Sequence, residues 1–273
     1  QLGRDVFQEA DITGACESFT KHSYLVKSVE DLPRVFKEAF HIAATGRPGP
    51  VLIDIPKDVT AATTEFIPKS RVEVHETYDI SEEQLKTVAD MIGKAERPFI
   101  YYGGGVEISD AGSELLALMR KAEIPSAHTM MAIGCVPDDD ELSLGMIGMH
   151  GSKASNMACD GCDLLIAVGC RFSDRVALKP ATFARQAKIV HIDIDRAEIN
   201  KNVETDHHII GDARRVLELL NKKLPQHDYP EWNEYILSMK EPVLPHDPEV
   251  LAPNEILDSI SKLTDAQAII ATD

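Results

Sequence analysis

The hydrophobic pattern between residues 81 and 224 alternates between helical and strand-like spacing. Ser81, with Gln84 three residues later, forms a capping box that predicts a helix over 82–95. Short apolar runs bounded by glycine or charged residues predict buried strands. The predicted strands are 98–102, 125–129, 163–169, 188–194 and 207–210, and further helices are predicted at 151–160, 196–201 and 213–223. Strands that alternate with helices indicate an α/β domain built on a parallel sheet covered on both faces.

Shorter segments with the same kind of pattern flank this region. Helical spacing from Ser28 to Gly46 precedes an apolar strand at 51–55, and a helix at 254–263 precedes a strand at 267–271. We predict that the segments between these units are linkers, because their hydrophobic residues show little periodicity or because they contain many prolines. The predicted division is 1–60, a linker at 61–80, a central domain at 81–224, a proline-rich linker at 225–253 and a last unit at 254–273.

The composition favours a soluble protein that binds neither membranes nor nucleic acids. The 273 residues are 44% hydrophobic and 27% charged, and no apolar run approaches the about 18 residues of a membrane span. A net charge of −17, with scattered Lys and Arg, repels a phosphate backbone. Five cysteines, an odd and sparse set, suggest a reducing, cytoplasmic compartment. Cys159 and Cys162 have redox or zinc spacing, but no second pair completes four ligands.

Candidate phosphate-binding residues follow two of the predicted strands. Ligands of open α/β sheets bind at the carboxyl ends of the strands. The glycines 103–105 after strand 98–102 could admit a phosphate, although a plain tight turn explains them equally well. Arg171 and Arg175 bracket a loop after strand 163–169, where they could grip phosphate or form a surface ion-pair cluster.

Carboxylates and an unusual loop follow other strands. Asp193 could accept hydrogen bonds from a ribose, whereas Asp195 suits a helix cap better. Asp212, after strand 207–210, could serve in the same way as Asp193 or cap the helix 213–223. The segment Met146–Gly151 combines apolar side chains that could pack on a flat ring with His150; a core loop with a structural histidine is the alternative. Together these features indicate a nucleotide site without specifying the nucleotide.

Several motifs taken together resemble a known family. Four stretches resemble, in order, the end of the pyrimidine-binding domain of acetolactate synthases: Phe7–Ile12, Thr20–His22, Gly46–Pro50 and Ile55–Val59. Three more resemble the middle domain of that family: Met146–Gly151, Arg171–Val176 and His191–Asn202. The Gly-Arg-Pro-Gly-Pro stretch alone is shared by many thiamine-diphosphate enzymes, whereas the other motifs favour acetolactate synthase.

The resemblance implies a fold and a cofactor. The fold would be a doubly wound parallel six-stranded sheet (Rossmann-like, DHS-like) as a middle domain, flanked by pieces of two thiamine-diphosphate-binding α/β domains. In the family the middle domain holds FAD, which takes no redox part in the main reaction. Ser173 departs from the family, where an aspartate is common at this position. By resemblance, the residues that contact FAD are Arg47, Gly104, Thr129, Met130, Ile147, Gly148, Met149, His150, Gly169, Cys170, Arg171, Phe172, Ser173, Asp174, Arg175, Asp193, Ile194, Asp212 and Ala213.

The resemblance also implies a reaction that the chain does not perform alone. The family condenses two pyruvates, or pyruvate and 2-oxobutyrate, with loss of CO2 in branched-chain amino-acid biosynthesis, using thiamine diphosphate and Mg²⁺. The family's catalytic glutamate and its diphosphate and magnesium motif are absent, so we expect an internal, inactive fragment with no metal site. Phe7, Gln8, Lys21 and Lys57 resemble residues that line the substrate channel. Large subunits of the family pair with one another, and a small regulatory subunit is a further possible partner.

Two other functions stay open at this point. The central domain could bind NAD or coenzyme A, as in another branch of the thiamine-diphosphate enzymes, although the loops Met146–Gly151 and Arg171–Arg175 argue against this. It could also be a structural or regulatory domain that binds no nucleotide. Titration with FAD separates these functions, because bound FAD is yellow and its fluorescence is quenched.

Overall fold

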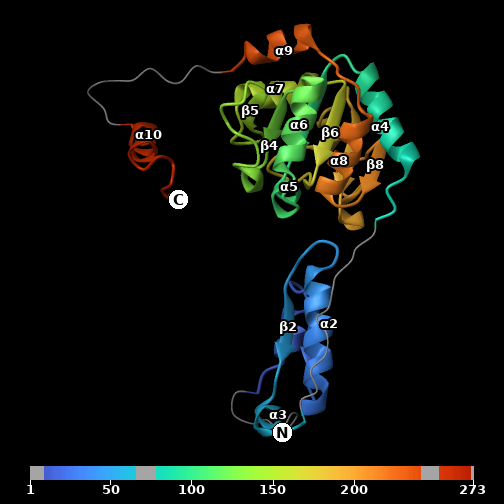
Figure 1. Cartoon of the computed structure of the whole chain (residues 1–273), viewed down its shortest axis with the longest axis vertical. Coiled ribbons are helices and arrows are strands. Elements are labelled where there is room, and N and C mark those ends of the chain that lie inside the picture. The colour runs from blue at the N-terminus through green and yellow to red at the C-terminus, as the bar shows by residue number, and fades with distance from the viewer. Residues whose placement is uncertain (1–8, 66–77, 241–251, 272–273) are drawn as a thin grey trace.

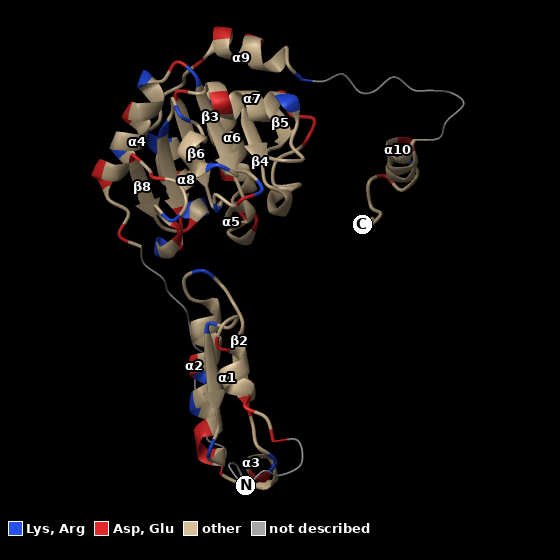
Figure 2. Ribbon diagram, turned by 180° about the vertical axis from the view of Figure 1, so that it is seen from behind, with Lys and Arg blue, Asp and Glu red and all other residues tan. Residues whose placement is uncertain are grey.

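The computed structural model describes residues 9–65, 78–240 and 252–271. Figure 1 shows a small N-terminal unit, a larger middle domain and a separate C-terminal helix along the chain. Acidic and basic residues are interspersed over the helices (Figure 2), and several of them pair, as Arg34 does with Glu38 at 2.9 Å. Within the described ranges, no helix is both long and apolar enough to span a membrane.

The middle domain is built on a parallel six-stranded sheet, as the family resemblance implies; the residue pattern alone predicted five of the strands. Its strand order is β5-β4-β3-β6-β7-β8, and every neighbouring pair is parallel. If β3 is counted as the first strand of the sheet, this order is 3-2-1-4-5-6, which is that of doubly wound folds. The strand order reverses between β3 and β6, although all strands point the same way. The strands are β3 (Pro98–Tyr102), β4 (Ser126–His128), β5 (Ser143–Met146), β6 (Leu164–Val168), β7 (Lys188–Asp193) and β8 (His207–Ile210).

Helices cover both faces of this sheet. Every residue of β3 and β6 is buried, which requires packing on each side. The capping box is present: the Ser81 side chain accepts from the backbone N–H of Gln84, and the Gln84 side chain accepts from that of Ser81. The helical elements before, between and after the strands are α4 (Glu82–Lys94), α5 (Gly104–Ile108), α6 (Gly112–Ala122), η2 (Met130–Ala132), α7 (Lys153–Gly161), η3 (Pro180–Thr182), η4 (Arg196–Glu198) and α8 (Ala213–Lys223).

Part of the expected linker at 225–253 belongs to the middle domain instead. Helix α9 (Pro230–Leu237) starts with proline, which is well suited to the first turn of a helix. The Trp232 Nε1 donates to the carbonyl oxygen of Pro98 at 2.9 Å, and the Tyr229 hydroxyl donates to that of Ile92 at 2.7 Å. Trp232 and Ile236 are buried in the main core. The prolines predicted an irregular chain, but apolar residues at helical spacing prevail here.

The N-terminal unit is much smaller. Its two parallel strands, β1 (His22–Leu25) and β2 (Val51–Asp54), contain no fully buried residue. Its buried core consists of Val26, Val35 and Val59. The helix predicted after Ser28 is present, with Ser28 as the cap of its first, tighter turn. The helical elements of this unit are α1 (Ile12–Cys16), η1 (Val29–Asp31), α2 (Leu32–Ala44) and α3 (Lys57–Ala61).

The C-terminal segment contains one helix, α10 (Pro253–Leu263), close to the prediction. The strand predicted at 267–271 is wrong, because these residues form no strand in the structure. An apolar run becomes a strand only beside a partner that pairs its backbone groups, and Ile269 is fully exposed.

Candidate functional site

The carboxyl ends of all six strands lie along one edge of the sheet. Backbone hydrogen bonds connect the residues just beyond them: Thr129 N to Tyr102 O at 2.9 Å, and Ile147 N to His128 O at 3.0 Å. Gly169 N likewise donates to Ile192 O at 2.8 Å. The structure therefore brings the predicted residues of the middle domain to one edge, although the sequence places them over more than a hundred positions.

Two of the glycines at the junction of β3 and α5 allow their backbone to pack closely on the backbone of Gly169. A Cβ on Gly103 would lie 2.7 Å from the carbonyl oxygen of Gly169, and one on Gly105 would lie 2.6 Å from the Gly169 Cα. Gly105 N also donates to Gly169 O at 2.8 Å. Gly103 and Gly105 therefore allow a close approach of backbone to backbone, and neither has a positive φ. Gly104, the predicted contact, has a backbone N–H without a partner among the described residues.

The loop after β6, residues 170–175 and here called the arginine loop, presents two arginines with no charged partner in the part of the chain that the structure describes. Arg171 and Arg175 are exposed, and neither forms an ion pair with a residue that the structure describes. The alternative of a surface ion-pair cluster is therefore not supported. Between the two arginines, Phe172 is buried, Ser173 is half-buried and Asp174 is exposed.

The loop after β5 contacts this arginine loop directly. Met149 N donates to Arg175 O at 2.9 Å. Gly148 has φ +105°, and a Cβ there would lie 2.4 Å from Arg175 O, so glycine is required. Ile147 is buried, whereas Met149 and His150 are exposed. Exposed Met130, after Thr129 at the end of β4, adds apolar surface along the same edge.

The three candidate carboxylates differ in what they bind. Asp195 accepts from Ala197 N at 2.9 Å and caps η4, and Asp212 accepts from Arg215 N at 3.0 Å and caps α8. Both are therefore helix caps, which the sequence favoured for Asp195 and left as one of two alternatives for Asp212. Asp193 accepts from Asp195 N at 2.8 Å through Oδ1, and its Oδ2 lies 3.7 Å from His191 Nε2. One oxygen of Asp193 thus stays available for a further donor; Ile194 and Ala213 follow Asp193 and Asp212 at this edge.

Arg47 extends from the N-terminal unit to the middle domain. Its guanidinium lies 3.2 Å from Glu198 Oε1 and 3.6 Å from Asp195 Oδ2. Glu198 is buried and also pairs with Lys201 at 3.1 Å. Unlike Arg171 and Arg175, Arg47 is therefore already paired with carboxylates.

Of the four predicted channel residues, the structure describes two, Lys21 and Lys57, and does not bring these two together. Phe7 and Gln8 lie outside the described residues. Lys21 donates to the carbonyl oxygens of Ile42 and Thr45 at the end of α2, where the helix dipole favours a cation. Lys21 precedes β1 and Lys57 follows β2, so the two lysines lie at opposite ends of parallel strands.

The cysteine pair has the wrong surroundings for redox or zinc chemistry. Cys159 and Cys162 are buried at the end of α7, and the Cys162 thiol donates to Cys159 O at 3.3 Å. Burial raises the pKa of Cys159 to about 12, whereas reactive thiols have lowered values. Over the described ranges, no group of three or more His, Cys, Asp or Glu side chains could hold a metal ion.

Three donors that the site prediction omitted hold the arginine loop. His191 Nε2 lies 3.0 Å from Cys170 O, the Tyr101 hydroxyl 3.3 Å from Arg171 O, and Asn202 Nδ2 2.8 Å from Phe172 O. His191 and Asn202 lie in a stretch that carries the family resemblance. Tyr101 gives the weaker signal of a hydroxyl within an apolar strand, and without the sheet order its partner could not be predicted.

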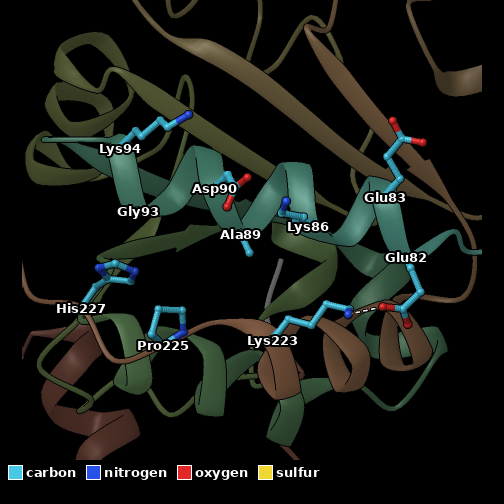
Figure 3. Close-up of a pocket in the computed structure, with 10 residues that line it drawn as sticks. All are labelled: Glu82, Glu83, Lys86, Ala89, Asp90, Gly93, Lys94, Lys223, Pro225 and His227. Carbon is cyan, nitrogen blue, oxygen red and sulfur yellow. Dashed lines mark ion pairs between the residues drawn. The ribbon is translucent and has the colours of Figure 1, made fainter.

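A charged groove lies away from the predicted residues, between α4 and the segment after α8 (Figure 3). Lys223 pairs with Glu82 across it. Acids and bases are mixed over the rest of its lining, so the groove offers no charge of a single sign to a ligand. The charged lining residues are Glu82, Glu83, Lys86, Asp90, Lys94 and Lys223.

Comparison with known proteins defines the class of the middle domain. Residues 85–220 match the family described as "Thiamine pyrophosphate enzyme, central domain". The six-stranded domain therefore belongs to the central domains of thiamine pyrophosphate enzymes.

Whole-chain relatives define the family more closely. The chain is 44% identical to the "Probable acetolactate synthase large subunit" of Methanocaldococcus jannaschii, over 100% of this chain and 49% of the relative. It is 41% identical to the large subunit of Corynebacterium glutamicum, over 98% and 45%, and 39% identical to that of Escherichia coli isozyme 2, over 100% and 50%. The chain is thus a homologue of acetolactate synthase large subunits, and it spans about half the length of these relatives.

Proposed function

We propose that the chain is part of an acetolactate synthase large subunit and supplies its FAD-binding central domain. The observation that carries this proposal is the pair of exposed arginines, Arg171 and Arg175, which have no charged partner among the described residues. They follow β6, at the point where the strand order of the sheet reverses. In a chain of net charge −17, two unpaired guanidinium groups on one short loop indicate an anionic ligand.

The residues at this edge fit the parts of FAD. Arg171 and Arg175, with the free N–H of Gly104, would hold the diphosphate. The available oxygen of Asp193 would accept from the ribose of the adenosine end. Exposed Met130 and Met149 would give the flat flavin ring an apolar surface. In the family the flavin supplies no electrons to the main reaction, so here it would fill the edge and order the loops around it.

The relatives are named acetolactate synthase large subunits, which supports a parent protein of that kind. By the family resemblance, the parent would condense two pyruvates, or pyruvate and 2-oxobutyrate, with loss of CO2. The parent would use thiamine diphosphate and Mg²⁺, work in the cytoplasm, pair with a second large subunit and bind a small subunit. Phe7, Gln8, Lys21 and Lys57 remain candidates for its substrate channel. This chain contains no counterpart of the family's catalytic glutamate, so we propose that it is inactive alone. Turnover of pyruvate in the presence of all three cofactors would contradict this.

Titration of the purified chain with FAD tests the binding proposal. We expect quenching of flavin fluorescence and yellow protein after desalting. Arg171→Ala combined with Arg175→Ala should raise the Kd at least about tenfold, because hydrogen bonds to charged groups are worth roughly 1.5–3 kcal/mol each. Arg120→Ala is the matched control, since this exposed arginine of α6 already pairs with Asp140 at 2.9 Å.

The alternatives predict different titrations. Strand order alone also suits a domain that binds NAD. Saturable binding of NAD or coenzyme A, with no response to FAD, would favour another branch of the thiamine-diphosphate enzymes. If the chain responds to neither FAD, NAD nor coenzyme A, the middle domain is a structural domain that binds no nucleotide, and the FAD proposal is wrong.

A further inference from the structure

Three successive carbonyl groups of the arginine loop each accept a hydrogen bond from a different element of the fold. Cys170 O accepts from His191 on β7. Arg171 O accepts from Tyr101 on β3 at 3.3 Å, in addition to a bond of 2.8 Å from the backbone N–H of Ser173 within the loop. Phe172 O accepts from Asn202, which follows η4. Exposed loops rarely have their carbonyls paired one after another with side chains, because most such groups bond to water. The arrangement fixes the direction of the loop backbone.

The side chain of Phe172 fixes the loop a second time. Phe172 is buried, and its ring lies 5.1 Å from that of His191, edge to face, and 5.8 Å from that of Tyr101. Phe183 completes the contact at 5.7 Å. Two of the three donors therefore also pack on this buried side chain of the loop.

This anchoring has a consequence for the groups that remain. Because the carbonyl groups of residues 170–172 are hydrogen-bonded to the protein, the groups of the loop that remain for a ligand are its N–H donors. The backbone N–H groups of Arg171, Phe172, Asp174 and Arg175 have no partner among the described residues. The guanidinium groups of both arginines are equally unpaired. N–H groups that converge next to cationic side chains form an anion site.

We propose that Tyr101, His191 and Asn202 are positioning residues that preorganise the arginine loop for the diphosphate of the ligand. They would act by holding the carbonyls of Cys170, Arg171 and Phe172 away from the anion. The inference rests on the proposed function for the nature of the ligand, but not for the anchoring itself. A carbonyl turned toward a phosphate would repel it, so each donor both orders the loop and removes a repulsive alternative.

The chemistry of the donors suits a fixed role. Burial raises the pKa of Tyr101 well above its ordinary range, so its hydroxyl keeps its proton at any physiological pH. His191 is fully buried, and its Nδ1 has no partner among the described residues, so the tautomer with the proton on Nε2 matches the contact with Cys170 O.

Two neighbouring tyrosines give a closely matched test. Tyr101 and Tyr102 are adjacent on β3 and both fully buried, but the Tyr102 hydroxyl has no partner among the described residues. Tyr101→Phe and Tyr102→Phe therefore remove the same atom from the same strand. We expect Tyr101→Phe to raise the Kd for FAD about three- to tenfold, the effect of one hydrogen bond, and Tyr102→Phe to leave it unchanged.

A second pair of variants tests His191 by rescue. In His191→Gln the side-chain amide nitrogen can lie where Nε2 lies now and still donate to Cys170 O. In His191→Asn the shorter side chain places its amide near the Nδ1 position, too far from that carbonyl. We expect His191→Asn to weaken FAD binding more than His191→Gln does. A purely volume-filling histidine would not give this order.

Tryptic cleavage provides a readout without any ligand. Trypsin cuts after Arg171 and Arg175, and the rate follows how often the loop opens. We expect cleavage there, followed by mass spectrometry, to be at least about threefold faster in Tyr101→Phe than in Tyr102→Phe, because the lost bond favours the open loop.

The combined results separate the two proposals. If the unmodified chain binds FAD, but the two tyrosine variants match in Kd and in cleavage, the positioning role is overturned. If the unmodified chain does not bind FAD, the proposed function fails, and cleavage alone decides the anchoring. Faster cleavage in Tyr101→Phe then supports it, and equal cleavage overturns it.

Discussion

The middle domain and the N-terminal unit use the same local pattern but reach very different degrees of burial. Every residue of β3 and β6 is buried, whereas β1 and β2 contain no fully buried residue. All of these strands pair in parallel. Parallel strands need cover on both faces, which six strands and their helices provide and two strands with α2 do not. Residue pattern alone therefore does not make a stable domain; the number of layers decides.

The two regions should differ most in the reactivity of their thiols. The middle domain holds Cys135, Cys159, Cys162 and Cys170, and burial raises the pKa of each, to about 12 for Cys135 and Cys159. A pKa more than three units above the ordinary value of about 8.5 lowers the thiolate fraction near pH 8 about a thousandfold. Cys135 is half-buried, and its thiol also donates to Glu107 Oε2 at 3.2 Å, which adds to the rise of its pKa. Cys16, in the N-terminal unit, is half-buried as well, but it has no such carboxylate contact among the described residues.

Alkylation of the native chain with iodoacetamide, read by peptide mass spectrometry, checks this difference. We expect Cys16 to react first, by a margin of at least about a hundredfold, and labelling of Cys135 to rise steeply with pH because only the thiolate reacts. In denaturant all five cysteines should react alike. Rapid labelling of Cys159 in the native chain would mean that the middle domain opens far more readily than its burial indicates.

The next largest effect should come from removing Trp232. Trp232→Ala deletes a buried ring together with its hydrogen bond to Pro98, and we expect a loss of about 3–5 kcal/mol in the free energy of unfolding of the middle domain. Phe40→Ala is the counterpart in the N-terminal unit, where the ring is 70% exposed, and it should cost about 0.5 kcal/mol or less. Urea unfolding followed by circular dichroism measures both. Equal losses would show that α9 is not part of the core.

A smaller but specific loss should follow from Gly169→Ala. Gly169 has φ +55°, and a Cβ there would lie 2.7 Å from the Cα of Gly105. We expect a loss of about 2–4 kcal/mol from the left-handed conformation and the overlap together. Gly134→Ala isolates the first cause, because Gly134 has φ +89° and no atom within 4 Å of a Cβ, and it should cost about 1–2 kcal/mol. Thermal unfolding compares the two; similar losses would mean that the contact with Gly105 is not tight.

The fold was predictable where the hydrophobic pattern and the local chemistry agree. The boundaries of β3, β8 and α8 match the expected ranges, because strong apolar runs or caps mark them. Strand β5 was missed, since Ser143 and Gly145 interrupt its apolar character and pairing with β4 stabilises it. Helix α9 and the absent strand at 267–271 show the same limit: tertiary contacts that local sequence does not reveal decide them.

The site was predictable in its location more than in its construction. Parallel order places the strand ends at one edge, so the gathering of Gly104, Arg171 and Asp193 follows from topology. The roles of individual residues depend on contacts across the sheet. Whether Gly105 packs on Gly169, or Tyr101 bonds to the arginine loop, depends on which strands are neighbours, and spacing along the chain does not give that order.

The smallest effect is expected at the contact between the two regions. Arg47→Ala removes the guanidinium that pairs with Glu198 and Asp195, but Glu198 keeps Lys201 as a partner. Because Arg47 is about half exposed, with 48% of its side chain accessible, we expect a change below about 1 kcal/mol in the unfolding of the middle domain. A double-mutant cycle with Glu198→Gln, read by thermal unfolding, gives the coupling free energy. A coupling above about 2 kcal/mol would exceed that of a solvent-exposed ion pair. It would show that the N-terminal unit and the middle domain unfold as one cooperative structure, and the contrast between the two regions would then be one of burial and not of stability.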